Sequence, residues 1–383
     1  MSVTAALGFR AAGVAAGLKS SGASDVALVV NDGPTYAAAG VFTANRVKAA
    51  PVIWSQQAVG DGVISAVVLN SGGANACTGP EGFLDTHRTA EHAADQLGMS
   101  AADVAVCSTG LIGDRLPLDL LLAGVDKAAA GLSTEGGADA AAAIMTTDSV
   151  PKQSVVGSAG FTVGGMAKGA GMLAPGLATM LVLLTTDAVV TAAELDVALR
   201  SATRTTFDRV DSDGCMSTND TVLMLASGAS AVAPSPRTFA EAVTAVCADL
   251  ARQLVADAEG STKDIAVEVI NAADEDDAVT VGRSVARSSL LKCAIYGEDP
   301  NWGRVLAAVG TTDADYEPDR LAVAINNVWV CRDGAAAAHR SEVDLSGREV
   351  RITVDLATGS SAATIWTNDL TAMYVHENSA YST

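Results

Sequence analysis

The chain has 383 residues, of which 49% are hydrophobic and only 4% are aromatic. A chain of this length can bury about 75% of the surface that it exposes when unfolded, which argues against intrinsic disorder. Aspartate and glutamate outnumber lysine and arginine by 44 to 24, and the resulting net charge of −20 disfavours binding to nucleic acids and to anionic lipid surfaces.

The six cysteines and four histidines do not form the patterns of a disulfide framework or a metal site. The sequence contains no CxxC pair, no HExxH motif and no Cys/His cluster, so we expect reduced thiols and no metal ion. The Gly- and Ala-rich run 11–18 is too weakly apolar for a signal peptide, and the apolar stretch 173–184 is too short to span a membrane. A cytoplasmic location fits these features best.

Short runs of β-branched residues predict strands in the first part of the chain, because they are bounded by Gly, Asn, Asp or Pro. A helix is predicted where Ala and charged residues recur at helical spacing, with Gly98 as its stop, and a further helical stretch is predicted where alanine dominates. The expected strands are 26–30, 41–43, 51–53, 63–69 and 104–107, and the expected helical segments are 83–98 and 127–143.

Two capping boxes, Thr191 with Glu194 and Thr238 with Glu241, predict helix starts in the second half. The helix after Thr238 places apolar residues on one face and is expected to end near Gly260. The remaining pattern predicts a strand at 265–269, a helix at 277–289, and strands at 321–325, 328–331, 350–355 and 362–366. This succession, without repeats or a low-complexity linker, predicts an α/β or α+β fold built of layered sheets.

The most unusual segment is 164–187, in which a Gly-rich approach containing Lys168 leads to Pro175 and then to Thr179 at the head of an apolar strand. A threonine hydroxyl in a strained turn can attack the carbonyl group before it, and water then hydrolyses the resulting ester. Cleavage between Ala178 and Thr179 would free an α-amino group whose reference pKa of about 7.7–8.0 suits a general base. Threonine is also a common strand former, so the pattern alone leaves both interpretations open.

The motif from Lys168 to Asp187 resembles the cleavage motif of the ornithine acetyltransferase (glutamate N-acetyltransferase) family. Two departures, Gly73 in place of an expected asparagine and the looser region 211–216, concern local substrate contacts rather than the nucleophile. Further family-like blocks occur in family order, so the resemblance covers nearly the whole chain: 41–46, 70–79, 108–110, 144–148, 217–221, 299–304 and 377–383.

The resemblance implies a layered α/β sandwich and a self-processing acetyltransferase of arginine biosynthesis. Thr179 would accept the acetyl group of N-acetylornithine and pass it to glutamate in a ping-pong cycle that requires no cofactor. Use of acetyl-coenzyme A as a second donor is left open. An α chain of residues 1–178 and a β chain of residues 179–383 would remain associated and assemble into a heterotetramer.

The resemblance also assigns roles to individual residues. Thr109 and Gly110 match the oxyanion hole, Lys168 matches the partner of the substrate carboxylate, and Glu259 matches the partner of a substrate amino group. Without the family, Thr109 and Gly110 would be an ordinary turn, Lys168 a solvated lysine, and Glu259 a poorly placed charge at a helix end. The remaining substrate-binding matches are Thr146, with Thr147 as its nearest rival, Asn378 and Thr383.

Two other classes of protein compete with this interpretation. A related self-processing amidase or aminopeptidase would use water in place of glutamate as the acceptor. A nucleotide-binding protein is disfavoured, because the Gly-rich segments contain neither GxGxxG in a strand–helix context nor GxxxxGK[ST].

Overall fold

The structure is a computed structural model that describes residues 2–174 and 180–380, and these residues form two compact units. The first unit comprises the described residues of Met1–Asp208 together with Cys215–Leu254, and the second comprises those of Arg209–Gly214 and Val255–Ser382. The predicted division into 1–178 and 179–383 falls inside the first unit, so both segments contribute to its core. That division itself stays a prediction.

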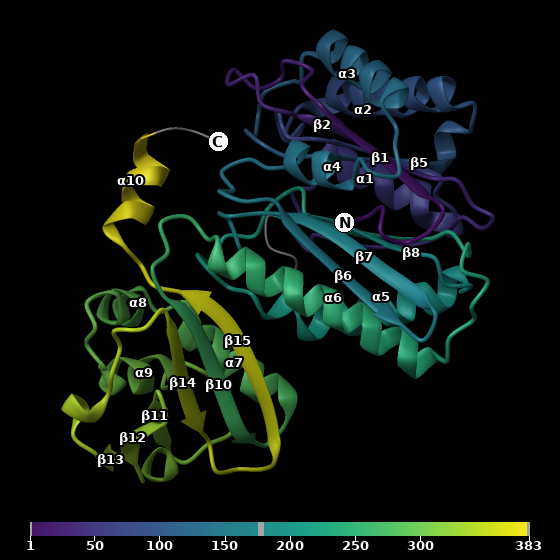
Figure 1. Ribbon diagram of the computed structural model, residues 1–383. Helices are drawn as coiled ribbons and strands as arrows, with labels where there is room; N and C mark the ends of the chain where they lie inside the picture. Colours follow the sequence, from purple (N-terminus) through teal and green to yellow (C-terminus); the bar gives the residue numbers. More distant parts are fainter. Residues whose placement is uncertain (1, 175–179, 381–383) are drawn as a thin grey trace. The chain divides into compact units, whose positions relative to one another are not determined.

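The described strands of the first unit form two sheets (Figure 1). The first sheet has the order β1 (Phe9–Val14), β2 (Val26–Asn31), β4 (Ala66–Asn70) and β5 (Val104–Ser108), and only the pair β4 and β5 is parallel. The second sheet has the order β3 (Ala37–Phe42), β9 (Thr221–Ala226), β8 (Leu181–Thr186), β7 (Phe161–Lys168) and β6 (Lys152–Ser158), and only the pair β8 and β9 is parallel.

The two sheets of the first unit pack face to face between outer helices. Val29 and Leu69 of the first sheet and Leu183 of the second belong to one buried core. The helices α2 (Gly79–Leu97) and α3 (Leu118–Ala130) pack on the other face of the first sheet. The helix α6 (Pro236–Ala256) covers the second sheet so closely that a Cβ on Gly165 would lie 3.0 Å from Leu250. The layered α/β fold predicted from the sequence is therefore confirmed.

Further helices complete the described part of the first unit. They are α1 (Ala50–Ala58), α4 (Gly137–Ala143) and α5 (Ala192–Thr205), with 3-10 turns at 59–61, 101–103 and 207–209. The predicted strand at 51–53 is wrong, because this run lies in α1, whose first turn accepts Pro51 without losing a hydrogen bond. The predicted helical stretch 127–143 is interrupted between α3 and α4, because Ser133 exchanges backbone hydrogen bonds with Ala11 of β1. The chain lies so close to β1 here that a Cβ on Gly136 would sit 1.9 Å from the Ala11 carbonyl oxygen.

One of the two predicted capping boxes is present. Thr191 and Glu194 cap α5 reciprocally, as the sequence predicted. The helix α6 begins earlier than expected, at Pro236, and the hydroxyl of Ser235 accepts the N–H of Thr238 at 3.2 Å. The predicted start at Thr238 is wrong because the serine three positions earlier supplies the cap.

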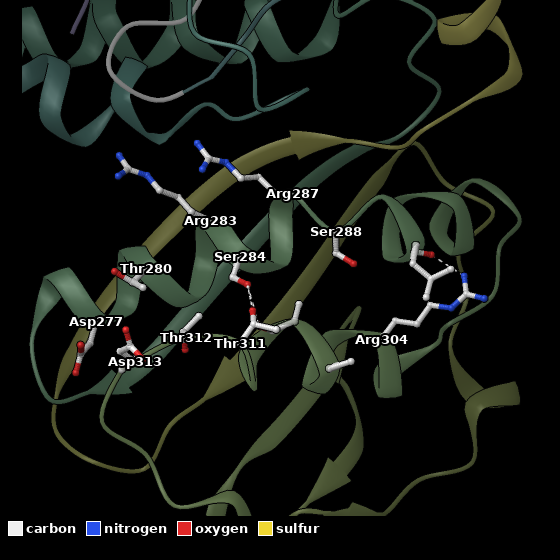
Figure 2. A pocket seen from close by; sticks show the side chains of 14 residues that line it. Asp277, Thr280, Arg283, Ser284, Arg287, Ser288, Arg304, Thr311, Thr312 and Asp313 are labelled. Atoms are coloured by element: carbon white, nitrogen blue, oxygen red, sulfur yellow. Dashed lines mark hydrogen bonds between the residues drawn. The ribbon is translucent and has the colours of Figure 1, made fainter. Parts of the chain in front are cut away.

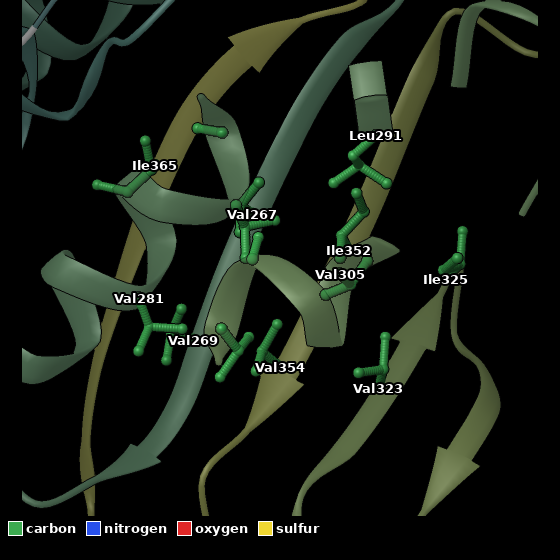
Figure 3. Packing of buried hydrophobic residues seen from close by; sticks show 14 of the residues in the cluster. Val267, Val269, Val281, Leu291, Val305, Val323, Ile325, Ile352, Val354 and Ile365 are labelled. Carbon is green, nitrogen blue, oxygen red and sulfur yellow. The ribbon is translucent and has the colours of Figure 1, made fainter. Parts of the chain in front are cut away.

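The second unit is built on one sheet. Every second residue of its central strands is apolar and packs against helices that cover one face of the sheet (Figure 3). Val267 of β10 (Asp264–Ala272), Ile352 of β14 (Glu349–Asp355) and Val281 of α7 (Glu275–Ala286) share its buried core. The strand order is β13 (Ala335–Ala336), β12 (Val328–Arg332), β11 (Ala322–Ile325), β14 (Glu349–Asp355), β10 (Asp264–Ala272) and β15 (Ser361–Asn368), with β10 and β14 parallel. The helices are α7 (Glu275–Ala286), α8 (Ser289–Tyr296), α9 (Trp302–Val309) and α10 (Ala372–Ala380), with 3-10 turns at 318–320 and 340–342.

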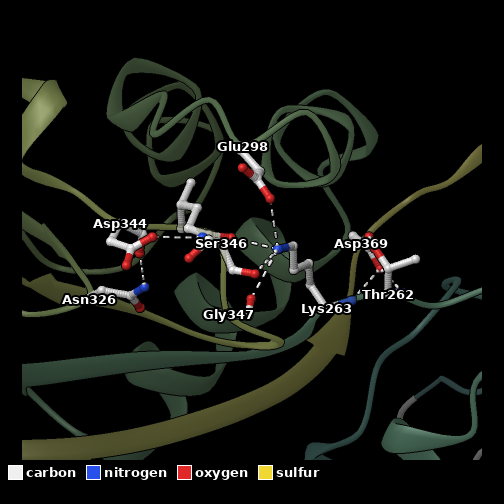
Figure 4. Close-up of polar contacts among 9 residues, drawn as sticks. Thr262, Lys263, Glu298, Asn326, Asp344, Ser346, Gly347 and Asp369 are labelled. Carbon is white, nitrogen blue, oxygen red and sulfur yellow. Dashed lines mark hydrogen bonds and ion pairs between the residues drawn. The ribbon is translucent and has the colours of Figure 1, made fainter.

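A buried lysine anchors the turn that leads into β14 (Figure 4). The Nζ of Lys263 donates to the carbonyl oxygens of Leu345 at 2.5 Å and Gly347 at 3.0 Å, and it lies 3.2 Å from the Glu298 carboxylate. A buried ammonium group needs such partners to offset the loss of water. We therefore assign Lys263 a structural role in the second unit.

Candidate active site

The first unit contains a polar cluster at the end of β7. Lys168, the last residue of β7, is only 2% exposed and donates from Nζ to the Thr146 hydroxyl at 3.1 Å. It is paired across the sheet with Leu181, the first residue of β8. Two residues that were predicted to bind substrate are thus in direct contact, and the interpretation of Lys168 as a solvated surface lysine is wrong.

Asp148 holds this cluster together. Its Oδ1 accepts from Lys152 Nζ at 2.5 Å and from the Gly169 amide at 2.7 Å, and its Oδ2 accepts from the Thr146 amide at 2.9 Å. Burial opposes ionisation of this carboxyl, but the charges of Lys168 and Lys152 together with the hydrogen bonds from Gly169 and Lys152 outweigh it and hold the pKa of Asp148 below its ordinary value. An ionised Asp148 therefore holds the backbone at Thr146 and at Gly169, the residue that follows Lys168.

A second buried carboxyl, that of Asp220, lies beside the start of β8. Asp220 directly precedes β9, which runs parallel to β8 with Thr221 opposite Leu181. Its Oδ1 accepts the Met180 amide N–H at 3.1 Å, and hydrogen bonds from the Thr43 and Ser217 side chains also favour the ionised form of the carboxyl. Burial raises the pKa of Asp220 well above its ordinary value, and the Met180 amide and the charge of Lys168 act in the opposite direction without cancelling the effect.

The predicted oxyanion-hole residues follow β5. The Thr109 amide donates to the Asn70 carbonyl at 3.0 Å, and the Thr109 carbonyl accepts from the Gly73 amide at 3.0 Å. Gly110 has φ +130°, and a Cβ there would lie 2.8 Å from the Gly73 nitrogen, so only glycine fits. Because the Thr109 amide is already bonded, the Thr109 hydroxyl and the Gly110 amide are the donors that this turn can offer to an oxyanion.

Asn219 joins this turn to the strand that carries Asp220. Its side-chain nitrogen donates to the carbonyl oxygens of Ser108 at 2.8 Å and Ala74 at 2.6 Å, and the residue is only 4% exposed. Within the blocks 144–148 and 217–221, the resemblance predicted a role only for Thr146. Asp148, Asn219 and Asp220 were missed, although the run of polar residues immediately before an apolar strand was a visible signal.

Two further predicted substrate-binding residues meet in the second unit. The Asn378 side-chain nitrogen of α10 donates to Glu259 Oε2 at 2.9 Å. The start of α10 is held close to this turn, because the Thr371 hydroxyl donates to the Gly260 carbonyl at 2.7 Å and a Cβ on Gly260 would lie 2.3 Å from the Tyr374 nitrogen. The sequence predicted both residues but not their contact. Ala178, Thr179 and Thr383 lie outside the described residues.

The second unit also has a large cavity that contains none of the predicted site residues (Figure 2). It has a volume of about 870 Å³ and lies between α7 and α9, where Ser284 donates to the Ala308 carbonyl at 2.8 Å. Its charged lining residues are Asp277, Arg283, Arg287, Arg304 and Asp313.

The sequence profile of the ArgJ family matches residues 10–383. The chain belongs to the ArgJ family. This confirms the resemblance to the ornithine acetyltransferases that the sequence blocks indicated. Within the parts of the chain that the structure describes, no helix of this ArgJ-family protein has the length and apolar character to cross a membrane.

Full-length relatives of this ArgJ-family chain are named arginine biosynthesis bifunctional protein ArgJ. The protein from Streptomyces avermitilis is 70% identical over 382 residues, and that from Thermobifida fusca is 65% identical over 383 residues, with 100% of both chains covered in each case. A solved ornithine acetyltransferase from Mycobacterium tuberculosis, in complex with ornithine, is 61% identical where it matches, covering 47% of this chain and 96% of that chain with a TM-score of 0.45.

Proposed function

We propose that the protein is a self-processing acetyltransferase of arginine biosynthesis, which moves the acetyl group of N-acetylornithine to glutamate through Thr179. The observation that carries this proposal is the buried contact between Lys168 and Thr146, directly across the sheet from the start of β8. A buried cation beside a hydroxyl suits the carboxylate of an amino-acid substrate. Membership of the ArgJ family supports the same reaction class.

Cleavage would begin when the Thr179 hydroxyl attacks the Ala178 carbonyl carbon, and water would hydrolyse the resulting ester. The products would be an α chain of residues 1–178 and a β chain of residues 179–383. The strands on the two sides of the cut, β7 and β8, pair antiparallel, with all of β8 opposite 163–168 of β7. This pairing supports lasting association of the two chains.

Acetyl transfer would then use the α-amino group of Thr179 as the base for its own hydroxyl. The hydroxyl oxygen attacks the acetyl carbonyl of N-acetylornithine, ornithine leaves, and the amine of glutamate attacks the acetyl ester in the second half of the cycle. The Thr109 hydroxyl and the Gly110 amide stabilise the oxyanion in both halves. No cofactor takes part in this exchange.

Substrate recognition divides between carboxylate and ammonium partners. Lys168 and Thr146 bind the carboxylate end, and Glu259 pairs with an amino group. Asn378 and Thr383 contribute further contacts from the end of the chain. The Asn378–Glu259 hydrogen bond supports a joint role for these two residues.

Several finer features belong to the same proposal. The processed protein assembles as a heterotetramer of α and β chains in the cytoplasm. Acetyl-coenzyme A serves as a second acetyl donor for glutamate, in keeping with the bifunctional activity named for the relatives.

The deciding experiment compares the wild type with Thr179→Ala and Thr179→Ser variants. We expect the wild type to run as two fragments with masses that meet at Ala178 and Thr179, and Thr179→Ala to stay a single chain of 38.5 kDa without activity. Thr179→Ser keeps a hydroxyl and should retain cleavage. Acetyl transfer to glutamate distinguishes the transferase from an amidase, which would release acetate from N-acetylornithine without glutamate.

A further inference from the structure

The loop between β1 and β2 is tied to a buried carboxylate. Asp25, directly before β2, is 0% exposed, and its carboxylate accepts the backbone amides of the consecutive residues from Ala16 to Lys19 at 2.6–3.2 Å. Hydrogen bonds to an ionised acceptor are stronger than those between neutral groups. The backbone at Lys19 is therefore held in place, although the loop contains no helix or strand.

The side chain of Lys19 extends from this anchor to a segment far away in the sequence. Its Nζ donates to the Ser24 carbonyl of the same loop at 2.9 Å and to the Met145 carbonyl at 2.7 Å. Met145 lies in the connection between α4 and β6, directly before Thr146. Lys19 thus binds the residue that precedes a proposed substrate-binding hydroxyl.

The peptide unit between Met145 and Thr146 is held at both of its polar groups. Its carbonyl oxygen accepts from Lys19 Nζ at 2.7 Å, and its N–H donates to Asp148 Oδ2 at 2.9 Å. Because a peptide unit is planar, these two contacts together fix the orientation of the plane and the direction in which Thr146 leaves it. Asp148 holds only the nitrogen, so the oxygen could turn away without Lys19.

Lys19 is also coupled to the polar cluster through its charge. Burial lowers the pKa of Lys19 from its ordinary value, and the charges of Asp25 and Asp148 act in the opposite direction. Lys168 and Lys152 act on the same Asp148 carboxyl from β7 and β6. Three lysines from separate parts of the first unit therefore converge on Asp148, and Lys19 among them holds the Met145 carbonyl.

We propose that Lys19 is a positioning residue that acts through Thr146. By holding the Met145 carbonyl, it keeps the Thr146 hydroxyl in the place where it accepts from Lys168 Nζ at 3.1 Å. This inference rests on the proposed function, which assigns Thr146 to the carboxylate end of the substrate. Lys19 would therefore affect the affinity for substrate rather than the chemical step.

The test compares Lys19→Met, Thr146→Val and the double variant by steady-state kinetics with N-acetylornithine at saturating glutamate. K19M should raise KM about tenfold and leave kcat within about twofold, because a contact made equally in the ground state and the transition state affects KM alone. In the Thr146→Val background K19M should change KM by less than about twofold, because the hydroxyl that Lys19 positions is already absent. Partial unfolding cannot imitate this result, since it lowers the measured kcat without changing KM.

Lys127→Met is the matched control, because Lys127 of α3 approaches the same loop, with its Nζ 3.5 Å from the Ala15 carbonyl. It should leave KM unchanged. Lys19→Gln, with a polar side chain one bond shorter, replaces K19M if that variant does not fold. An unchanged KM in the Lys19 variant overturns the inference, and so does a rise that multiplies with that of Thr146→Val. A wild-type KM in Thr146→Val would instead refute the role proposed for Thr146 itself, and this inference with it.

Discussion

Lys168 and Leu181 are cross-strand partners in the antiparallel pair of β7 and β8, although the predicted cleavage site lies between them in the sequence. The chain leaves the sheet after one residue and returns to it beside the other. A cut in this connection leaves the ladder between the strands intact, because no hydrogen bond of the β7–β8 pair depends on the intervening peptide.

We therefore expect the two fragments of the processed protein to elute together from a size-exclusion column under native conditions. Leu183 and Met166, on opposite sides of the cut, are buried in the same core, so separation would expose a large apolar surface. A denaturing gel of the eluted peak should show both fragments. Recovery of either fragment alone at native pH would contradict this expectation.

Replacing Lys168 with methionine should lower kcat/KM by about 100-fold or more, because it removes the buried cation proposed to bind the substrate carboxylate. Methionine replaces the apolar stem of the lysine side chain, so the core around β7 should remain packed. Steady-state kinetics with N-acetylornithine and glutamate measure the effect. Lys127→Met on the exposed face of α3 is the matched control and should retain wild-type rates.

Thr109→Val should reduce kcat by about 100- to 1,000-fold, the usual effect of losing one oxyanion donor. Valine preserves the shape of the side chain and leaves the Thr109 amide bonded to the Asn70 carbonyl. Thr109→Ser keeps the hydroxyl and should recover most of the rate. Wild-type kcat in Thr109→Val would exclude this hydroxyl from the oxyanion hole.

The Asp148 carboxyl should contribute to the free energy of unfolding at neutral pH but not in acid. Its pKa in the folded protein lies below the ordinary value, so the stability that it contributes is fully present above the ordinary carboxyl pKa of about 3.9 and is lost as pH falls through the lower folded value. Thermal unfolding should therefore show a larger difference between the wild type and Asp148→Asn at pH 7 than at pH 3. An equal difference at both pH values would contradict this assignment.

Asn219→Ala should lower kcat by about tenfold without abolishing folding, because the turn that carries Thr109 loses the two hydrogen bonds from Asn219 to Ser108 and Ala74. The cost in folding free energy should be about 1–3 kcal/mol, since both carbonyl groups are left without this donor. Kinetics and chemical denaturation measure the two effects separately. An unchanged kcat would show that the turn holds its geometry without Asn219.

The sequence predicted much of the layered fold because strands and helices leave local patterns. The β-branched run at 26–30 became β2, and the Thr191–Glu194 box became the start of α5. The run at 51–53 misled because Pro51 and Val52 are compatible with a strand in isolation, whereas their surroundings place them in α1. Packing of α1 against β5, where Ser55 donates to the Val106 carbonyl at 2.7 Å, decides the outcome and is invisible locally.

The candidate site was predictable only through the family resemblance. Lys168 and Thr146 meet because the chain passes through β6 and β7 before returning, and no local pattern encodes that approach. Asp148 and Asp220 were missed for a related reason. Their importance comes from burial beside Lys168, which depends on how β7, β8 and β9 are arranged in one sheet.

The position of β8 inside its sheet also constrains the order of events in the life of the protein. Its neighbours, β7 and β9, come from opposite sides of the proposed cut, so β8 is paired along both edges only after segments from both sides of the cut have assembled. Under the proposed chemistry, a misfolded copy never generates the terminal amine and stays inert. The proportion of cleaved chains in a cell extract would then report directly how much of the newly made protein has matured.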